Sequence, residues 1–465
     1  MLSRLWRKTA VFIITVALFP LFIYLATTPP DLTLANFGAD GGELITAAAT
    51  LGVPHPPGYP TYVLLGKLFS LLPVRTIAFR LHLFSAVSSA LAAGFLADGL
   101  RRFVPTETAV ATAYTLAFCQ LVWGQAIIAE VYAPALLFVT LTIWAVHTPK
   151  PAWLTAVFWG IAITFHLTAV FLAPILFVHL RPKQDNAPFH HQFSNFNFQF
   201  LTGLLIGSTP WLLLPWLAQQ NSPIVWGSPT TLSGWWWLVT AVLYRPNVLA
   251  LPASQWLPRL QQWLPLLAAQ FTWAGVPLLL WTINKPPPIR PTLPYWLTAA
   301  FILFYSFTYN TSDALVFTIP ALLILLIPLT PALTALRHLA FILPLALLLL
   351  NFNMQQLSRE QMPRAEVMTL LAQTPPNAIL ATPGDETLFV LWYFQHVEGL
   401  RPDVVLMDTQ LFGFDWYRTR LSQTYADLFV PSSFDIPAFI QQNQTKRPYC
   451  TITLSTQSLL CQPEP

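Results

Sequence analysis

The stretch that decides the fold is Gly38-Ala-Asp40-Gly-Gly-Glu43, followed by Leu51-Gly-Val-Pro-His55-Pro-Pro-Gly-Tyr59-Pro. It comes directly after the first long apolar run, which extends from Val11 to Thr28. Two carboxylates therefore stand three residues apart, beside two glycines, where the chain leaves that run. Because ionisable groups are costly at membrane depth, they usually mark a functional cavity. This pair is the first candidate for chemistry.

The composition indicates a protein built mainly for a lipid environment. The 465 residues are 55% hydrophobic and only 9% charged, whereas soluble domains carry about 25% charged residues. A deficit on this scale predicts an α-helical polytopic membrane protein. The net charge of +4 is explained by lysines and arginines at the ends of spans, so we expect no nucleic-acid partner.

Charge asymmetry predicts the topology. Arg4, Arg7 and Lys8 precede the first span, which places the N-terminus in the cytoplasm and the loop 29–79 outside. Within this loop, Glu43 to Leu51 and Tyr62 to Leu72 read as amphipathic helices at the membrane surface. Ten further spans are expected, which gives about 11 transmembrane helices, with ten to thirteen defensible. They cover about 81–100, 108–122, 132–147, 153–166, 168–180, 199–218, 262–283, 294–309, 314–330 and 337–351, with basic cytoplasmic loops at Arg181-Pro-Lys183 and Lys285 to Arg290.

The composition shifts after the last span, so residues 1–351 are interpreted as the transmembrane domain and 352–465 as a small soluble α/β domain outside the cytoplasm. Residues 378–382 and 403–407 read as buried strands, and 386–398 as a helix between them. A third strand is expected at 449–454. Cys450 and Cys461 would pair if this end faces an oxidising compartment, and would otherwise remain reduced thiols.

Asp40 and Glu43 admit two interpretations. On one helical face they repel each other, and partial burial raises the pKa of at least one, which suits a base that accepts a proton from a hydroxyl. Alternatively, Asp40 caps a helix and Glu43 completes a capping box.

Further polar residues are expected on the same side of the membrane. The prolines after His55 predict a rigid elbow with a turn at Pro57-Gly58. It either fixes the directions of His55 and Tyr59 or merely connects two surface helices, with His55 solvated. The other candidates for a shared cavity are Glu130, Tyr132, His166 and Asp313, each of which could instead simply mark the end of a span. Arg245 is the leading candidate to bind a phosphate, or else a headgroup anchor, among the outside cations Lys67, Arg75, Arg80, Arg245 and Arg259.

The ordered set of motifs resembles a known family. An acidic pair in the first outside loop, after one span, is similar to the arrangement in the GT-C superfamily of membrane glycosyltransferases. The fuller strings Asp40-Gly-Gly-Glu43, Leu51-Gly-Val-Pro-His55-Pro-Pro-Gly58, Arg80-Leu-His-Leu-Phe-Ser-Ala86 and Ala129-Glu-Val-Tyr132 resemble domain-of-unknown-function family 2723, which includes O-mannosyltransferases of the transmembrane-protein-260 type. The likeness is densest over about residues 36–180.

The resemblance implies a multi-pass cell-membrane enzyme that moves a sugar, with mannose favoured, from a polyprenyl-phosphate donor to a hydroxyl of a protein or glycan acceptor. Asp40 would be the general base, and Glu43 would orient the acceptor or tune Asp40. A single displacement would invert the anomeric carbon, and no metal or cofactor is required if a cation covers the phosphate. A transporter or flippase of lipid-linked sugars is the alternative, followed by a non-catalytic receptor.

Overall fold

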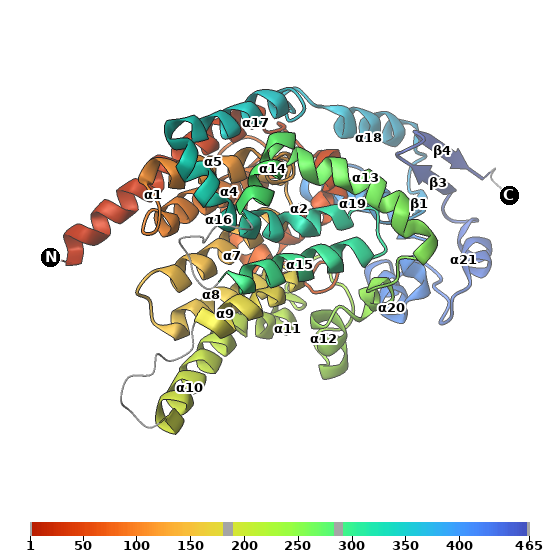
Figure 1. Cartoon of the computed structure of the whole chain (residues 1–465). Helices are drawn as coiled ribbons and strands as arrows, with labels where there is room; N and C mark the ends of the chain where they lie inside the picture. Colours follow the sequence, from red (N-terminus) through yellow and green to blue (C-terminus); the bar gives the residue numbers. More distant parts are fainter. Residues whose placement is uncertain (1, 180–188, 283–291, 463–465) are drawn as a thin grey trace.

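A computed structural model describes residues 2–179, 189–282 and 292–462 of the chain. The two basic loops expected at Arg181-Pro-Lys183 and Lys285 to Arg290 lie outside the described residues. Helices form the bulk of the molecule, and a small sheet lies at the end far from the start of α1 (Leu2–Thr27), close to the C-terminus (Figure 1). The predicted helical membrane protein with C-terminal strands is therefore confirmed in its main features.

Several helices are long and apolar enough to cross a membrane. Within the described ranges there are 4, at Arg7–Thr27, Ile77–Leu100, Phe198–Leu217 and Ala314–Phe352, or 5 if one bent pair forms a single span. The first two are α1 and α4 (Ile77–Leu100). Shorter apolar helices are α7 (Tyr132–His147), α8 (Ala152–Phe165), the run Leu167–Val178 that contains α9 (Ala173–His179), and α15 (Leu293–Thr308). The total of eleven spans stays a prediction.

Two predicted spans are broken, and a hydrogen bond joins the two breaks. The span expected at 262–283 is wrong as a single helix, because α13 (Trp256–Ala269) and α14 (Thr272–Thr282) meet at a bend of 90°. The span expected at 108–122 is likewise divided into α5 (Thr106–Phe118) and α6 (Gln120–Ala126). Gln270, at the bend, accepts a hydrogen bond from the backbone N–H of Leu121 at 2.9 Å. Broken backbone in a membrane protein needs such buried partners.

The segment 29–79, expected to be an outside loop, is buried more deeply than predicted. It contains a 3-10 turn (Ala35–Asp40), α2 (Gly41–Thr50) and α3 (Pro60–Ser70). The prediction that α2 lies on the surface is wrong, because every residue from Gly41 to Ala48 is buried. Its cover is α19 (Asp385–Trp392), from the C-terminal part of the chain, which lies against α2. In contrast, leucine side chains are exposed at the end of α3, at Leu68 and at Leu71, the residue that follows the helix.

The C-terminal sheet confirms the three predicted strands and adds a fourth. The strands are β1 (Ile379–Thr382), β2 (Val405–Asp408), β3 (Tyr449–Thr453) and β4 (Ser458–Cys461), in the order β2-β1-β3-β4. β1 is parallel to β2 and β3, whereas β4 is antiparallel to β3. The predicted helix between β1 and β2 is α19, extended by a π-helical turn at Tyr393–Val397. Of the two interpretations of the cysteines, pairing is correct, since a disulfide joins Cys450 to Cys461.

The remaining helices complete the two ends of the molecule. The membrane part also contains α10 (Phe189–Ser208), α11 (Leu214–Leu217), α16 (Ile319–Leu336) and α17 (Ile342–Phe352), and a short helix, α12 (Leu232–Val239), follows α11. Around the sheet lie α18 (Met362–Gln373), α20 (Asp415–Thr424) and α21 (Ile436–Asn443).

The C-terminal segment shares its hydrophobic core with the segment 29–79. One continuous cluster of buried side chains joins α2 and α3 to α18, α19 and the sheet. A charged junction reinforces it: Arg364 binds the carboxylates of Asp31 and Glu398, the latter at 2.8 Å, and the hydroxyl of Tyr393 donates to Asp31 at 2.9 Å. The division at residue 351 stays a prediction, but the two sides of it are packed as one body around the candidate site.

Candidate active site

Asp40 and Glu43 do not form a capping box. Asp40 precedes the first residue of α2, and its side chain makes no capping hydrogen bond. The carboxylate of Glu43 turns away from the start of the helix and binds His55 instead. The capping interpretation of this pair is therefore wrong, because neither carboxylate caps the helix.

His55 bridges the two carboxylates. One oxygen of Glu43 accepts the backbone N–H of His55 at 3.2 Å, and the other forms a short hydrogen bond with ring nitrogen Nδ1. On the other side of the ring, Nε2 lies 3.6 Å from Oδ2 of Asp40. The order along this line is Glu43, His55, Asp40. Such an arrangement fixes the imidazole ring and aims one nitrogen at Asp40.

The accessibility of these three residues differs, and the difference separates their roles. The side chain of Glu43 is 0% exposed and that of His55 is 6% exposed, whereas the side chain of Asp40 is 35% exposed. A reactant can therefore reach Asp40, but Glu43 is already surrounded and both of its oxygens are engaged. Asp40 is the group in this line that can meet a substrate.

The elbow after His55 holds it in place. The backbone N–H of Gly58 donates to the carbonyl of His55 at 2.9 Å, so the expected turn forms, and the Pro56-Pro57 peptide is cis. Before the elbow, Val53 pairs with the segment around Val225 in a short parallel bridge. The interpretation of His55 as a solvated connector is wrong, because the chain is fixed on both sides of it.

Four aromatic rings enclose the imidazole of His55. Tyr59, Trp226 and Tyr244 meet it edge-on, with centroid distances of 5.1, 6.1 and 6.0 Å. Phe389 of α19 lies parallel to it at 6.2 Å. Tyr59 was predicted to belong to the site, but Trp226, Tyr244 and Phe389 were not, although Tyr244 directly precedes the candidate Arg245. These rings exclude water from His55 and strengthen its interactions with the carboxylates.

Burial and charge set the ionisation of this group. Burial disfavours the imidazolium, but the carboxylates of Asp40 and Glu43 outweigh it and raise the pKa of His55 to about 10. Burial also raises the pKa values of Asp40 and Glu43, and the charge of His55 partly opposes this. We infer that His55 carries a proton at neutral pH and acts as the counter-ion of the acidic pair.

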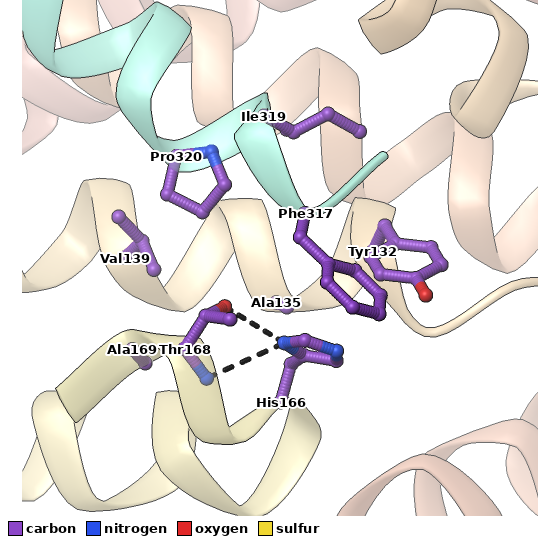
Figure 2. Close-up of a pocket in the computed structure, with 9 residues that line it drawn as sticks. All are labelled: Tyr132, Ala135, Val139, His166, Thr168, Ala169, Phe317, Ile319 and Pro320. Carbon is purple, nitrogen blue, oxygen red and sulfur yellow. Dashed lines mark hydrogen bonds between the residues drawn. The ribbon is translucent and has the colours of Figure 1, made fainter. Parts of the chain in front are cut away.

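A second cluster of predicted residues lies nearby. Tyr132, at the start of α7, and His166, at the end of α8, face each other with ring centroids 5.2 Å apart, and Phe317 contacts both (Figure 2). They line a small pocket. Nδ1 of His166 is bonded to the hydroxyl of Thr168 at 2.7 Å. His166 thus also caps the 3-10 turn Leu167–Leu172 that follows it.

Glu130 and Asp313 act on the first group through charge. Glu130 is 1% exposed, and one of its carboxylate oxygens has no hydrogen-bond partner among the described residues. Burial, followed by the charge of Asp40, raises the pKa of Glu130 well above its usual value. Asp313 also raises the pKa of Asp40, which places it in the same electrostatic neighbourhood. Both residues are therefore parts of one acidic region.

The predicted cations are mostly occupied by backbone carbonyls. Lys67 donates to Ala49, Arg80 to Ser70, and Arg259 to Phe307 and Tyr309. Arg245 is exposed and donates to the hydroxyl of Thr240 at 2.8 Å, directly after Tyr244 in the chain. Of these, Arg245 is accessible, and the residue before it, Tyr244, contacts the imidazole of His55.

Comparison with solved structures defines the class of the fold. One similar structure is ArnT from Cupriavidus metallidurans, crystallised with undecaprenyl phosphate. The match covers 91% of this chain and 96% of the ArnT chain, at 15% sequence identity and a TM-score of 0.53. The apo form of the same protein matches 89% of this chain, and 92% of its own, at 13% identity and a TM-score of 0.56. The chain therefore shares the overall fold of ArnT, which is the GT-C fold.

Comparison with families and curated relatives is more specific. Residues 40–187 match the model of the protein O-mannosyl-transferase TMEM260 N-terminal domain, and residues 364–457 match the TMEM260-associated domain 2. The mouse protein O-mannosyl-transferase TMEM260 is 26% identical over 92% of this chain and 69% of its own length. The Dictyostelium discoideum counterpart is 22% identical, over 92% of this chain and 61% of its own. Over most of its length the chain is therefore similar to TMEM260-type protein O-mannosyl-transferases.

Proposed function

We propose that this protein transfers a sugar, with mannose favoured, from a polyprenyl-phosphate carrier to a hydroxyl group of a protein acceptor on the extracytoplasmic side of the membrane. The observation that carries the proposal is an accessible Asp40 held beside a buried His55–Glu43 pair. The names of the mouse and Dictyostelium relatives support the reaction class and the acceptor. The undecaprenyl phosphate bound to ArnT supports the type of carrier.

The chemistry requires one proton acceptor and two positioned reactants. The acceptor hydroxyl oxygen attacks the anomeric carbon, the bond from that carbon to the phosphate oxygen breaks, and polyprenyl phosphate leaves with the electron pair. The hydroxyl proton passes to Asp40. A single displacement of this kind inverts the anomeric centre, and most of the rate comes from positioning and charge stabilisation.

Glu43 and His55 serve Asp40 in this proposal. Both oxygens of Glu43 are bonded to His55, so the tuning role expected for Glu43 is favoured over direct contact with the acceptor. Its carboxylate keeps the imidazole charged and pointed at Asp40. The fixed positive charge of His55 favours the ionised form of Asp40. It therefore keeps Asp40 ionised before the reaction and limits its basicity.

Two features complete the proposal. The leaving phosphate needs a cation, and the accessible Arg245 beside Tyr244 is our candidate. No metal or cofactor is expected. The disulfide between Cys450 and Cys461 supports placing the C-terminal segment outside the cytoplasm, since such bonds persist in oxidising compartments. The N-terminus would then be cytoplasmic.

The test is transfer by the purified protein. We expect incubation with polyprenyl-phosphate mannose and a serine- or threonine-containing peptide to release polyprenyl phosphate and mannosylate the peptide. Asp40→Asn should lower the rate by about 10²- to 10⁴-fold with the melting temperature retained, and Glu107→Gln, an exposed acid on α5, should behave as wild type. Full activity in Asp40→Asn would exclude Asp40 as the base, and lipid flipping without transfer would favour the transporter.

A further inference from the structure

Asp385 reaches the candidate site from the opposite end of the sequence. It is the first residue of α19, the helix that covers α2. The two helices approach so closely that a Cβ atom added to Gly42 would lie 2.2 Å from the carbonyl oxygen of Phe389. Gly384, with φ of +154°, allows the chain to enter α19 at this angle. The close contact between α2 and α19 that closes the site therefore also fixes the position of Asp385.

The face of α19 that carries Asp385 is the face that meets His55. Residues four apart lie on the same side of a helix, one turn above the other. Phe389 follows Asp385 by four residues and stacks on the imidazole of His55 with an angle of 8° between the planes. Asp385 therefore lies one turn along from this stacked ring. It is also close enough to the acidic group for the charges of Glu43 and Asp40 to act on it.

Asp385 is reachable but has no partner of its own. Its side chain is exposed, and no group among the described residues donates a hydrogen bond to it. Even so, the surrounding protein and its neighbours affect it: burial and the charge of Glu43 raise the pKa of Asp385 to about 7, opposed by His55 and reinforced by Asp40 and Asp408. The adjacent Glu386 is also exposed.

We propose that Asp385 is a positioning residue for the acceptor, whose carboxylate accepts a hydrogen bond from an N–H or O–H group of the acceptor polypeptide and so places the reacting hydroxyl beside Asp40. This inference rests on the proposed function. It makes the C-terminal segment part of the reaction centre instead of a separate recognition module. The donor sugar-lipid does not need Asp385.

The test compares Asp385→Asn with Glu386→Gln, which removes the neighbouring charge on the same helical turn. With polyprenyl-phosphate mannose and a threonine-containing peptide, Asp385→Asn should raise the KM for the peptide at least tenfold and leave the KM for the donor within twofold of wild type. In wild type the peptide KM should fall as the pH rises through about 7, because the ionised carboxylate is the better acceptor. This dependence should flatten in Asp385→Asn and persist in Glu386→Gln.

Other outcomes separate the two proposals. Equal effects of the two substitutions, or a loss of donor binding in Asp385→Asn, would overturn the role of Asp385 while transfer by wild type upheld the proposed function. A fall in kcat as large as that of Asp40→Asn with an unchanged peptide KM would also overturn it. Absence of transfer in the wild-type protein would overturn the proposed function itself and this assignment with it.

Discussion

The imidazole of His55 and the phenyl ring of Phe389 lie nearly parallel, with 8° between their planes and 6.2 Å between their centroids. One ring belongs to the segment 29–79, and the other to the C-terminal segment. Together with the contact between Gly42 and the backbone of Phe389, this stack means that the C-terminal segment forms one wall of the candidate site. Changes at the junction should therefore affect both stability and activity.

Gly42→Ala should loosen this wall. The added Cβ would lie 2.2 Å from the Phe389 carbonyl, and backbone cannot yield as a flexible side chain does. We expect a loss of about 1–3 kcal/mol in unfolding free energy and faster proteolysis of the C-terminal segment. Gly41→Ala is the matched control, since its Cβ would lie 3.5 Å from the nearest atom, an ordinary contact. Equal melting temperatures for the two variants would contradict the close packing of α2 on α19.

The parts of the fold that follow from local pattern were predictable. Apolar length gave the principal spans, and short apolar runs with charged borders gave strands β1, β2 and β3 at nearly their observed positions. The break at Cys119 was not predictable, because it depends on Gln270, a residue distant in sequence that supplies the hydrogen bond to Leu121. Hydropathy alone predicts one uninterrupted helix for each of the broken spans, 108–122 and 262–283.

Several residues of the site could be predicted from the sequence, but the contacts between them could not. Spacing alone favoured a capping box for Asp40 and Glu43, since nothing local indicates that the proline turn returns His55 to Glu43. Phe389 and Asp385 had no local signal that placed them near Asp40. The burial of α2 was missed for the same reason, because its cover, α19, comes from the far end of the chain.

Glu43→Gln should slow the reaction without weakening acceptor binding. The amide keeps the size of the side chain but removes the charge that holds His55 protonated and oriented. We expect kcat to fall about 10- to 100-fold, a loss of about 1.4 to 2.7 kcal/mol of transition-state stabilisation, with the peptide KM unchanged. Steady-state kinetics checks this. Should the peptide KM rise instead, Glu43 would be orienting the acceptor directly.

Arg364→Met should weaken the charged junction between Asp31 and the C-terminal segment. The substitution leaves Asp31 and Glu398 close together without their shared cation. Removing one partner of a buried pair costs about 3–5 kcal/mol. Because Arg364 is 35% exposed, we expect about 2 kcal/mol after allowing for solvent screening. Arg359→Met, at an exposed position nearby, should leave the melting temperature unchanged in the same detergent, and a similar loss there would point to a nonspecific effect of charge.

The stability of the protein should fall in mildly alkaline solution because of His55. Its pKa is raised to about 10 in the folded chain from about 6.5 when unfolded. Between these values the folded state binds the extra proton, so this contribution to stability is complete below about pH 6.5 and is lost as the pH rises through about 10. The slope is at most about 1.4 kcal/mol per pH unit.

The measurement is the difference in melting temperature between wild type and His55→Gln at several pH values from 6 to 10. That difference should shrink steadily as the pH rises. His396→Gln provides the control: burial lowers the pKa of folded His396 to about 4, and the unfolded histidine is deprotonated above about pH 7.5, so from about pH 7.5 to 10 this difference should stay constant. A constant difference for His55→Gln as well would mean that His55 does not carry its proton between the two carboxylates.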